Sequence, residues 1–196
     1  MKRLTNEPLA HVAQDGRAHL LSEHLGDVAR LAGKLAEVFG GESAARVAGL
    51  WHDLGKYSGD FQNMIRTANG YEAHLEGEGN ERDHSTAGAL HAIEVMGSRA
   101  LPVAMAIAGH HTGLGDLPNV KARLRDRGKR LRDAVLANAP PEELLDYTSY
   151  ELPEFAETTP HSSEFFVRML FSCLVDADFL DTEAFYDPGR SASRCS

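Results

Sequence analysis

The sequence predicts an all-α protein, on three observations. Apolar residues recur at spacings of three and four along most of the chain, and alternating runs of the kind found in strands are scarce. Glycine and proline fall between the periodic segments, where helices end or begin. With 196 residues, the chain is long enough for one domain around a single sizeable core. We therefore expect one helical bundle.

The first expected helix covers about residues 20–39 and ends at Gly40-Gly41, a pair that can adopt the left-handed conformation. The second covers about 42–54, with Gly55 as its C-terminal cap and His52 and Asp53 in its last turn. The apolar stripe of the first helix is formed by Leu21, Leu25, Val28, Leu31, Leu35 and Val38.

The rest of the chain continues as helices separated by polar segments. A polar stretch at 70–83 has too few apolar residues to pack, and we expect it to be a mobile loop. The segment 148–160 interrupts the helical pattern. The tail 188–196 is expected to be frayed or the start of a linker, after one domain over 1–187. The further expected helices lie at about 61–68, 84–96, 102–109, 119–138, 140 onward and 162–185.

Composition limits the classes of function. The net charge of −9 argues against a protein that binds nucleic acid over its whole surface, so any such contact must be local or assisted. No apolar stretch approaches the ~20 residues of a membrane span, and the N-terminus lacks the apolar core of a secretory signal. The spacing of Cys173 and Cys195 suggests no disulfide framework. We expect a soluble cytoplasmic protein.

The histidines form the most informative pattern. His52 and Asp53 are adjacent, and further histidines precede and follow them at 24, 84, 110 and 111. Adjacent helical side chains point roughly 100° apart, so this pair can serve one centre only if other elements converge on it. Imidazole and carboxylate ligands without a Cys-x-x-Cys pair suit a catalytic divalent metal better than a structural zinc.

The ordered set resembles the HD metal-dependent phosphohydrolase superfamily. Within it, the chain most resembles the nuclease domain of the CRISPR type I nuclease-helicase, type I-C branch, over roughly residues 10 to 187. The motifs that carry the resemblance are Leu-Ser-Glu-His-Leu (21–25), His-Asp-Leu-Gly-Lys (52–56), Asp-His-Ser-Thr-Ala-Gly (83–88), Ala-Gly-His-His-Thr-Gly (108–113) and Leu-Val-Asp-Ala-Asp-Phe-Leu-Asp-Thr-Glu (174–183).

The resemblance implies a role for each residue of the pattern. One metal would be held by His24, His52, Asp53 and Asp178, and a second by Asp53 with His84, His110 and His111. Lys56 would place a positive charge near the phosphate oxygens in the transition state, and Ser85 or Thr86 would contact phosphate or water. One or two ions are expected, of manganese, iron, cobalt or nickel, with magnesium and zinc as alternatives.

The implied activity is metal-dependent hydrolysis of single-stranded DNA in CRISPR interference. Family members work with an ATP-driven, superfamily 2-type helicase, fused or separate, and with an RNA-guided surveillance complex. No P-loop motif occurs here, so this chain is not that motor, and we expect it to be part of a longer fused protein. Two alternatives remain open: hydrolysis of nucleotides or cyclic nucleotides, and a non-catalytic docking module stabilised by metal.

Several residues have competing interpretations. Helical phase favours Asp178 over Asp176 as the last ligand, whereas Asp181 would support a ligand from behind. The basic segment 121–132 either guides a DNA strand or an acidic partner, or is a solvated helix face. Trp51 is expected in the core. The histidines left as ordinary residues are His11, His19, His74, His91 and His161.

Overall fold

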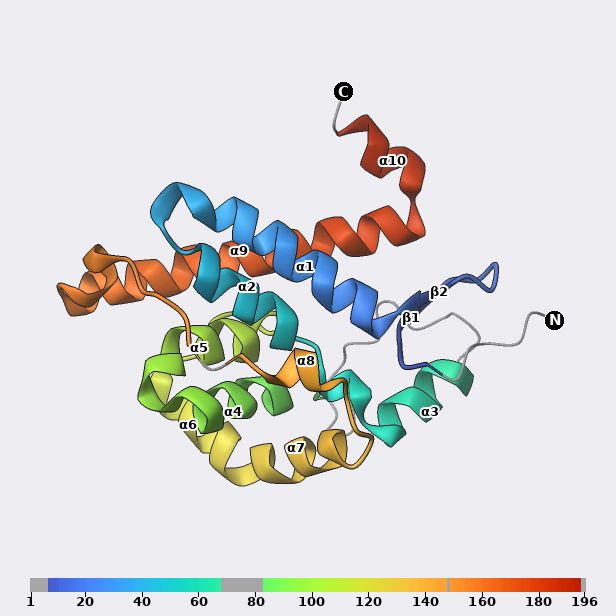
Figure 1. The fold of residues 1–196 in the computed structure, drawn as a ribbon, viewed down its shortest axis with the longest axis horizontal. Coiled ribbons are helices and arrows are strands. Elements are labelled where there is room, and N and C mark those ends of the chain that lie inside the picture. Colours follow the sequence, from blue (N-terminus) through green and yellow to red (C-terminus); the bar gives the residue numbers. More distant parts are fainter. Residues whose placement is uncertain (1–6, 68–82, 148, 195–196) are drawn as a thin grey trace.

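The computed structural model describes residues 7–67, 83–147 and 149–194. Helices dominate this part of the chain and pack as a bundle, which confirms the predicted all-α class (Figure 1). The predicted loop at 70–83 lies outside the described residues except for Asp83, as does His74.

The N-terminal layer of the bundle consists of two helices joined by a tight turn. Helix α1 (Leu21–Ala36) continues into the short 3-10 helix η1 (Glu37–Phe39) and stops at Gly40, whose φ of +72° is the predicted left-handed cap. Helix α2 (Glu42–Trp51) then runs back along α1. Leu35 and Val38 were wrongly placed in the buried stripe: they are 39% and 88% exposed. The buried face of α1 runs through Ala32 and Ala36 and leaves Leu35 outside it, and Val38 lies in η1, beyond the end of α1.

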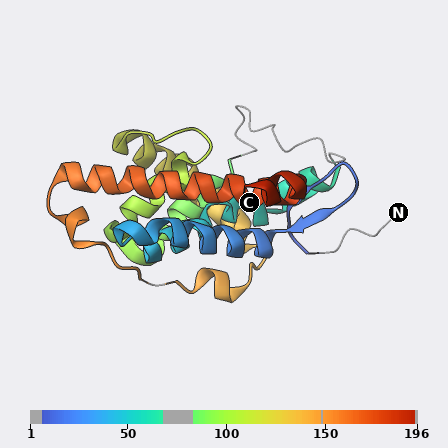
Figure 2. The same cartoon turned by 90° about the horizontal axis from the view of Figure 1, so that it is seen from above.

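The long helix α9 (Pro160–Tyr186) lies beside α1 in both ribbon views and also contacts α2 and α5 (Figures 1 and 2). Thr159 opens it with a capping box, in which its hydroxyl accepts the Ser162 amide and the Ser162 hydroxyl accepts the Thr159 amide. The apolar core between these helices includes Trp51, Phe166, Leu170 and Leu174, all fully buried. Trp51 is therefore a core residue, as predicted.

The central part of the chain forms the other layer. Helices α4 (Ser85–Met96) and α5 (Leu101–Gly109) pack on each other, joined by η3 (Gly97–Ala100). Helix α6 (Leu117–Arg123) contacts α5, and the π-helical turn that follows it (Leu124–Gly128) and helix α7 (Lys129–Leu136) cover α4, where one surface helix was predicted. The smaller elements are η2 (Leu54–Tyr57), α3 (Gly59–Thr67), α8 (Glu142–Leu145), η5 (Glu154–Glu157) and α10 (Pro188–Ser193).

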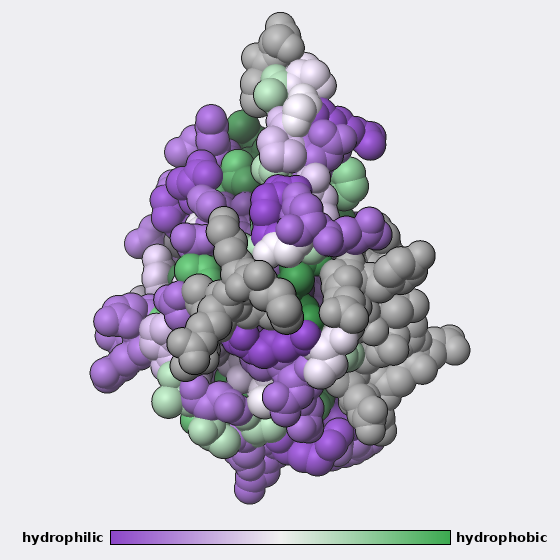
Figure 3. Space-filling model, turned by 90° about the vertical axis from the view of Figure 1, so that its right-hand side faces the viewer, coloured by the Kyte–Doolittle hydropathy of each residue, from purple (hydrophilic) through white to green (hydrophobic). Residues whose placement is uncertain are grey.

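A two-stranded antiparallel hairpin precedes the bundle and was not predicted. Strands β1 (Leu9–Val12) and β2 (Ala18–Leu20) pair with His11 opposite His19, and the hairpin lies at the same end of the molecule as α3. Figure 3 shows the molecule from the side where the hairpin and α3 lie. Among the described residues, hydrophilic side chains predominate on this side, and hydrophobic ones show only in small separate areas.

Two further expectations need correction. Within the tail, residues 188–193 form a short helix, α10, rather than a frayed end, because Asp187 accepts the Arg190 amide and Arg190 and Arg194 pair with Glu183. The run Ser85–Gly109 does reach membrane-like length and apolarity by composition. It folds as α4 and α5, whose many buried alanines pack in the core, so its apolarity gives no evidence of a membrane span.

Candidate metal centre

Asp53 lies at the middle of the candidate site. Helix α2 ends at Trp51, His52 is its C-cap, and Asp53 follows with φ −108° and ψ 19°. His52 and Asp53 are therefore just beyond the last helical turn, not in it as predicted. Leaving the helix lets both side chains reach one centre, and the Asp53 carboxylate is 1% exposed.

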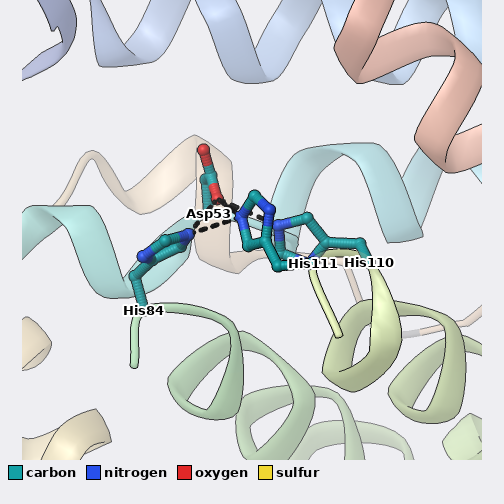
Figure 4. A group of neighbouring side chains, drawn as sticks. All are labelled: Asp53, His84, His110 and His111. Carbon is teal, nitrogen blue, oxygen red and sulfur yellow. Dashed lines mark hydrogen bonds and ion pairs between the residues drawn. The ribbon is translucent and has the colours of Figure 1, made fainter. Parts of the chain in front are cut away.

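One oxygen of this carboxylate faces three histidines. Asp53 Oδ1 lies 3.2 Å from His84 Nε2, 3.3 Å from His110 Nε2 and 3.9 Å from His111 Nε2. His84 precedes α4, whereas His110 and His111 follow α5, so two helix ends converge on one atom (Figure 4). The Nε2 atoms of His84 and His111 are 2.7 Å apart. We call Asp53, His84, His110 and His111 the second cluster.

The other oxygen faces residues from the N-terminal layer and α9. Asp53 Oδ2 lies 3.3 Å from His24 Nε2 and 3.4 Å from His52 Nε2. Asp178 Oδ1 lies 3.4 and 3.6 Å from the same two nitrogens. Asp176 is on the exposed side of α9, so the helix presents Asp178, as its phase predicted. We call His24, His52, Asp53 and Asp178 the first cluster.

Three of the histidine rings are held in place through Nδ1, the ring nitrogen that points away from the centre. Their Nδ1 atoms contact the Gly49 carbonyl (2.8 Å from His52), the Ile107 carbonyl (2.7 Å from His110) and the Asp181 carboxylate (2.6 Å from His24). An Nδ1–H that donates to such a partner leaves the lone pair on Nε2, which is the arrangement of metal-binding histidines. Asp181 thus supports His24 from behind, the role that the sequence suggested for it.

Four of the atoms that point into the centre lack hydrogen-bond partners. Among the described residues, the buried side-chain atoms without one include Asp53 Oδ1 and the Nε2 atoms of His24, His52 and His110. Orphaned polar atoms are costly in a protein interior, and ligand atoms about 2.1 Å from one ion lie about 3.0–3.4 Å from each other. Five of the observed separations, 3.2–3.4 Å, match this spacing. The pairs His52–Asp178 (3.6 Å), Asp53–His111 (3.9 Å) and His84–His111 (2.7 Å) lie outside it. The donor set therefore fits divalent cations bound on both sides of Asp53.

Comparison with known families agrees with this geometry. The family model described as "HD domain" matches residues 21–139, more than half of the chain. The chain belongs to the HD domain family. It has the family's metal-dependent phosphohydrolase character, and the buried His/Asp cluster fits divalent metal binding. No curated protein matches the chain. The finer resemblance to a CRISPR nuclease of the type I-C branch stays a prediction.

The match leaves two parts of the site outside the HD model. Asp178 and Asp181 come from α9, and the β1–β2 hairpin precedes residue 21. The hairpin brings His11 and His19 next to His24, with ring centroids 4.9 and 5.4 Å from it. These two histidines were left as ordinary residues. A signal for the hairpin existed, because Asp15-Gly16 is a typical hairpin turn and Gly16 has φ +83°.

Electrostatics in this HD site favour ionised carboxylates. Burial by itself raises the pKa of Asp53, but His52, Lys56 and His84 outweigh it and hold the pKa well below its usual range. Burial likewise lowers the pKa of His52, yet Asp53 and Asp178 raise it to about 10. Burial and the neighbouring His111 lower the pKa of His110 to about 4. The centre is thus built to bind positive charge, and protons compete with metal for His52.

The residues predicted to contact substrate lie in different environments. Lys56 is buried, and its Nζ lies 2.7 Å from Asp53 Oδ2, so its cation is at the centre as expected. The Ser85 and Thr86 hydroxyls accept hydrogen bonds from Arg123, and Thr86 is fully buried. Their environment therefore gives no support to the predicted role in phosphate binding.

Proposed function

We propose that this HD domain is a divalent-metal-dependent nuclease that cuts single-stranded DNA. The observation that carries the proposal is the shared carboxylate: Asp53 presents one oxygen to each of the two clusters. Two such ions, when bound, would activate water and stabilise the attacking and leaving oxygens of a phosphodiester. Manganese, iron, cobalt and nickel suit these ligands best, with magnesium and zinc as alternatives.

The protein's own residues supply orientation and charge. Asp53 and Asp178 stay ionised and balance the positive charge of the centre. His24, His52 and His110 hold their Nε2 atoms inward through Nδ1 contacts, so little reorganisation is needed when substrate arrives. The Lys56 ammonium places positive charge where negative charge builds up on the phosphate oxygens during the reaction. No side chain is required as nucleophile.

Accessibility supports attack on an extended substrate. Asp53 is almost completely buried, but the side chains of His111 and Asp178, at the outer edges of the two clusters, each retain 20% exposure. Substrate can therefore approach along the line between these two residues. In an acidic protein such an edge-on approach suits a single flexible strand better than a rigid duplex, because only a short stretch of phosphates needs to contact the protein.

The proposed setting is CRISPR type I interference. The five motifs that carry this resemblance include every ligand of both clusters and Lys56. In that setting a superfamily 2-type helicase, fused or separate, supplies the unwound strand, and an RNA-guided surveillance complex recruits it. A cytoplasmic location follows from the same proposal.

The deciding experiment uses circular single-stranded DNA. Metal-stripped protein is supplied separately with manganese, cobalt, nickel, iron, magnesium and zinc, and Asp53→Ala and Asp178→Ala are assayed in parallel. Asp176→Ala is the matched control, because Asp176 is exposed on the same helix as Asp178. We expect a transition metal to restore cutting in the wild type and in the control only. Hydrolysis of nucleotides or cyclic nucleotides without DNA cleavage would replace this proposal by the nucleotide hydrolase. No hydrolysis of any substrate would favour the docking module.

A further inference from the structure

Arg123, in the basic segment 121–132, does not behave as a solvated surface residue. Arg123, the last residue of α6, has a side chain only 19% exposed. Its Nε donates to Thr86 Oγ1 (2.5 Å) and its Nη1 to the Ala108 carbonyl (2.8 Å). Its Nη2 donates to both Asp83 Oδ1 (2.9 Å) and Ser85 Oγ (2.5 Å). All three nitrogens of one guanidinium are thus engaged.

These acceptors lie next to ligands of the second cluster. Asp83 and Ser85 are the residues immediately before and after His84, and the Ala108 carbonyl is two residues before His110. One guanidinium therefore ties the start of α4 to the end of α5, the two helix ends that approach Asp53 Oδ1. Among the described residues, none of the Arg123 hydrogen bonds reaches α1, α2 or α9, which carry the first cluster's histidines and Asp178.

The same contacts fix the backbone around His84. His84 is the N-cap of α4 and makes no side-chain capping bond. Asp83 caps this end in its place, because its Oδ1 accepts the Thr86 amide at 3.1 Å while its Oδ2 accepts the Thr86 hydroxyl at 2.7 Å. Arg123 compensates the charge of this carboxylate. His84 is thereby left to direct its imidazole at Asp53.

We propose that Arg123 is a positioning residue that holds the ligands of the second cluster, and only those, in place to bind a metal ion. The inference rests on the proposed two-metal function and deepens it. The planar fork of arginine is needed because the acceptors come from two different helix ends; a lysine ammonium on a flexible stem cannot contact all of them at once. Arg123 touches neither substrate nor metal in this assignment.

The test counts bound ions instead of measuring cleavage. Chelator-treated protein is titrated with Mn²⁺, and free Mn²⁺ is followed by its electron paramagnetic resonance signal. We expect two ions in the wild type. In Arg123→Gln one ion should bind as before and the other about 10-fold to 100-fold more weakly, the range seen when a partner that orients a metal ligand is lost. Arg125→Gln is the matched control, since Arg125 lies in the same segment with 74% exposure and should leave both ions in place.

The possible outcomes test the role of Arg123 and the nuclease proposal separately. Two ions of unchanged affinity in Arg123→Gln would overturn the role of Arg123 and leave the nuclease proposal intact. A single ion in the wild type would overturn the two-metal centre and the inference with it. If Arg123→Gln loses one ion selectively but the wild type does not cut DNA with any metal, the role of Arg123 is supported and the nuclease proposal is refuted. If Arg123→Gln fails to fold, Arg123→Lys decides: selective weakening of one ion supports the inference, and equal weakening of both overturns it.

Discussion

The backbone amide of Gly55 donates a hydrogen bond of 3.0 Å to the carbonyl oxygen of His84. The two segments that carry His52-Asp53 and His84 therefore meet backbone to backbone, directly beside the carboxylate they share. A Cβ atom at Gly55 would lie 2.2 Å from that oxygen and 2.4 Å from the His84 Cα. Gly55 is required for this close approach, and it does not act as the C-terminal cap of α2 that the sequence predicted, because α2 ends at Trp51 with His52 as its cap.

Replacing Gly55 by alanine should therefore destabilise the protein and weaken the second cluster. The clash is with backbone and cannot be relieved by turning a side chain, so we expect a loss of about 2 kcal/mol or more in the free energy of unfolding. Urea denaturation of the chelator-treated protein measures this loss.

Gly26→Ala is the matched control for that substitution. Gly26 lies in α1 with nothing within 4 Å of the added Cβ, so alanine there should stabilise the helix by about 0.5–1 kcal/mol. Equal effects of the two substitutions would show that the close approach of Gly55 to His84 is unimportant.

Asp181 should control how tightly the first cluster binds metal. Its carboxylate lies 2.6 Å from His24 Nδ1, and loss of such a partner lowers metal affinity by about 10-fold to 100-fold. We expect this loss in Asp181→Ala, and a smaller one in Asp181→Asn, whose amide oxygen still accepts the hydrogen bond. Mn²⁺ titration provides the readout. Identical affinities in wild type and Asp181→Ala would mean that His24 is held by packing alone.

Lys56 should act on turnover more than on metal content. Its ammonium, close to Asp53 Oδ2, is the cation placed to meet the phosphate. In Lys56→Ala we expect kcat for DNA cleavage to fall by about 100-fold or more, with the metal content retained. Lys34→Ala, at an exposed position of α1, should change neither quantity. Loss of metal from Lys56→Ala would instead assign Lys56 a structural role.

The helices could be predicted from the sequence where apolar residues at helical spacing are the residues that become buried. Leu21, Leu25 and Val28 recur at helical spacing and are fully buried, so the α1 stripe was visible in the sequence. The hairpin was not predicted because strands as short as Leu9–Val12 show no clear alternation. Its Asp15-Gly16 turn was the one local sign.

The resemblance implied both the residues of the candidate site and their grouping on the two sides of Asp53, but not the contacts that support them. The order of His24, His52, Asp53 and the later histidines indicated one centre, because that order resembles the HD pattern. The role of Arg123 could not be predicted: its sequence neighbours are also basic, and only the folded chain brings it to Asp83 and Ala108. Long-range contacts of this kind leave no local pattern.

His91 should make stability depend on pH, separately from the metal centre. It is 3% exposed, packs edge-on against Trp51 with ring centroids 4.6 Å apart, and burial together with the charge of Arg132 lowers its pKa to about 4. Because the folded pKa lies below that of the unfolded chain, the unfolded state binds more protons below about pH 6.5. The free energy of unfolding is therefore not reduced by His91 above about pH 6.5, and it decreases as the pH falls from there towards 4.

We therefore expect the wild type to lose about 1–3 kcal/mol more stability than His91→Gln between pH 7 and pH 4, measured by urea denaturation with a chelator present. The chelator removes the contribution of metal binding, so the difference between the two proteins isolates His91. His161→Gln is the control, because His161 is exposed and the substitution should leave the pH profile unchanged. Parallel profiles for wild type and His91→Gln would show that His91 takes up a proton in the folded protein as easily as in the unfolded chain.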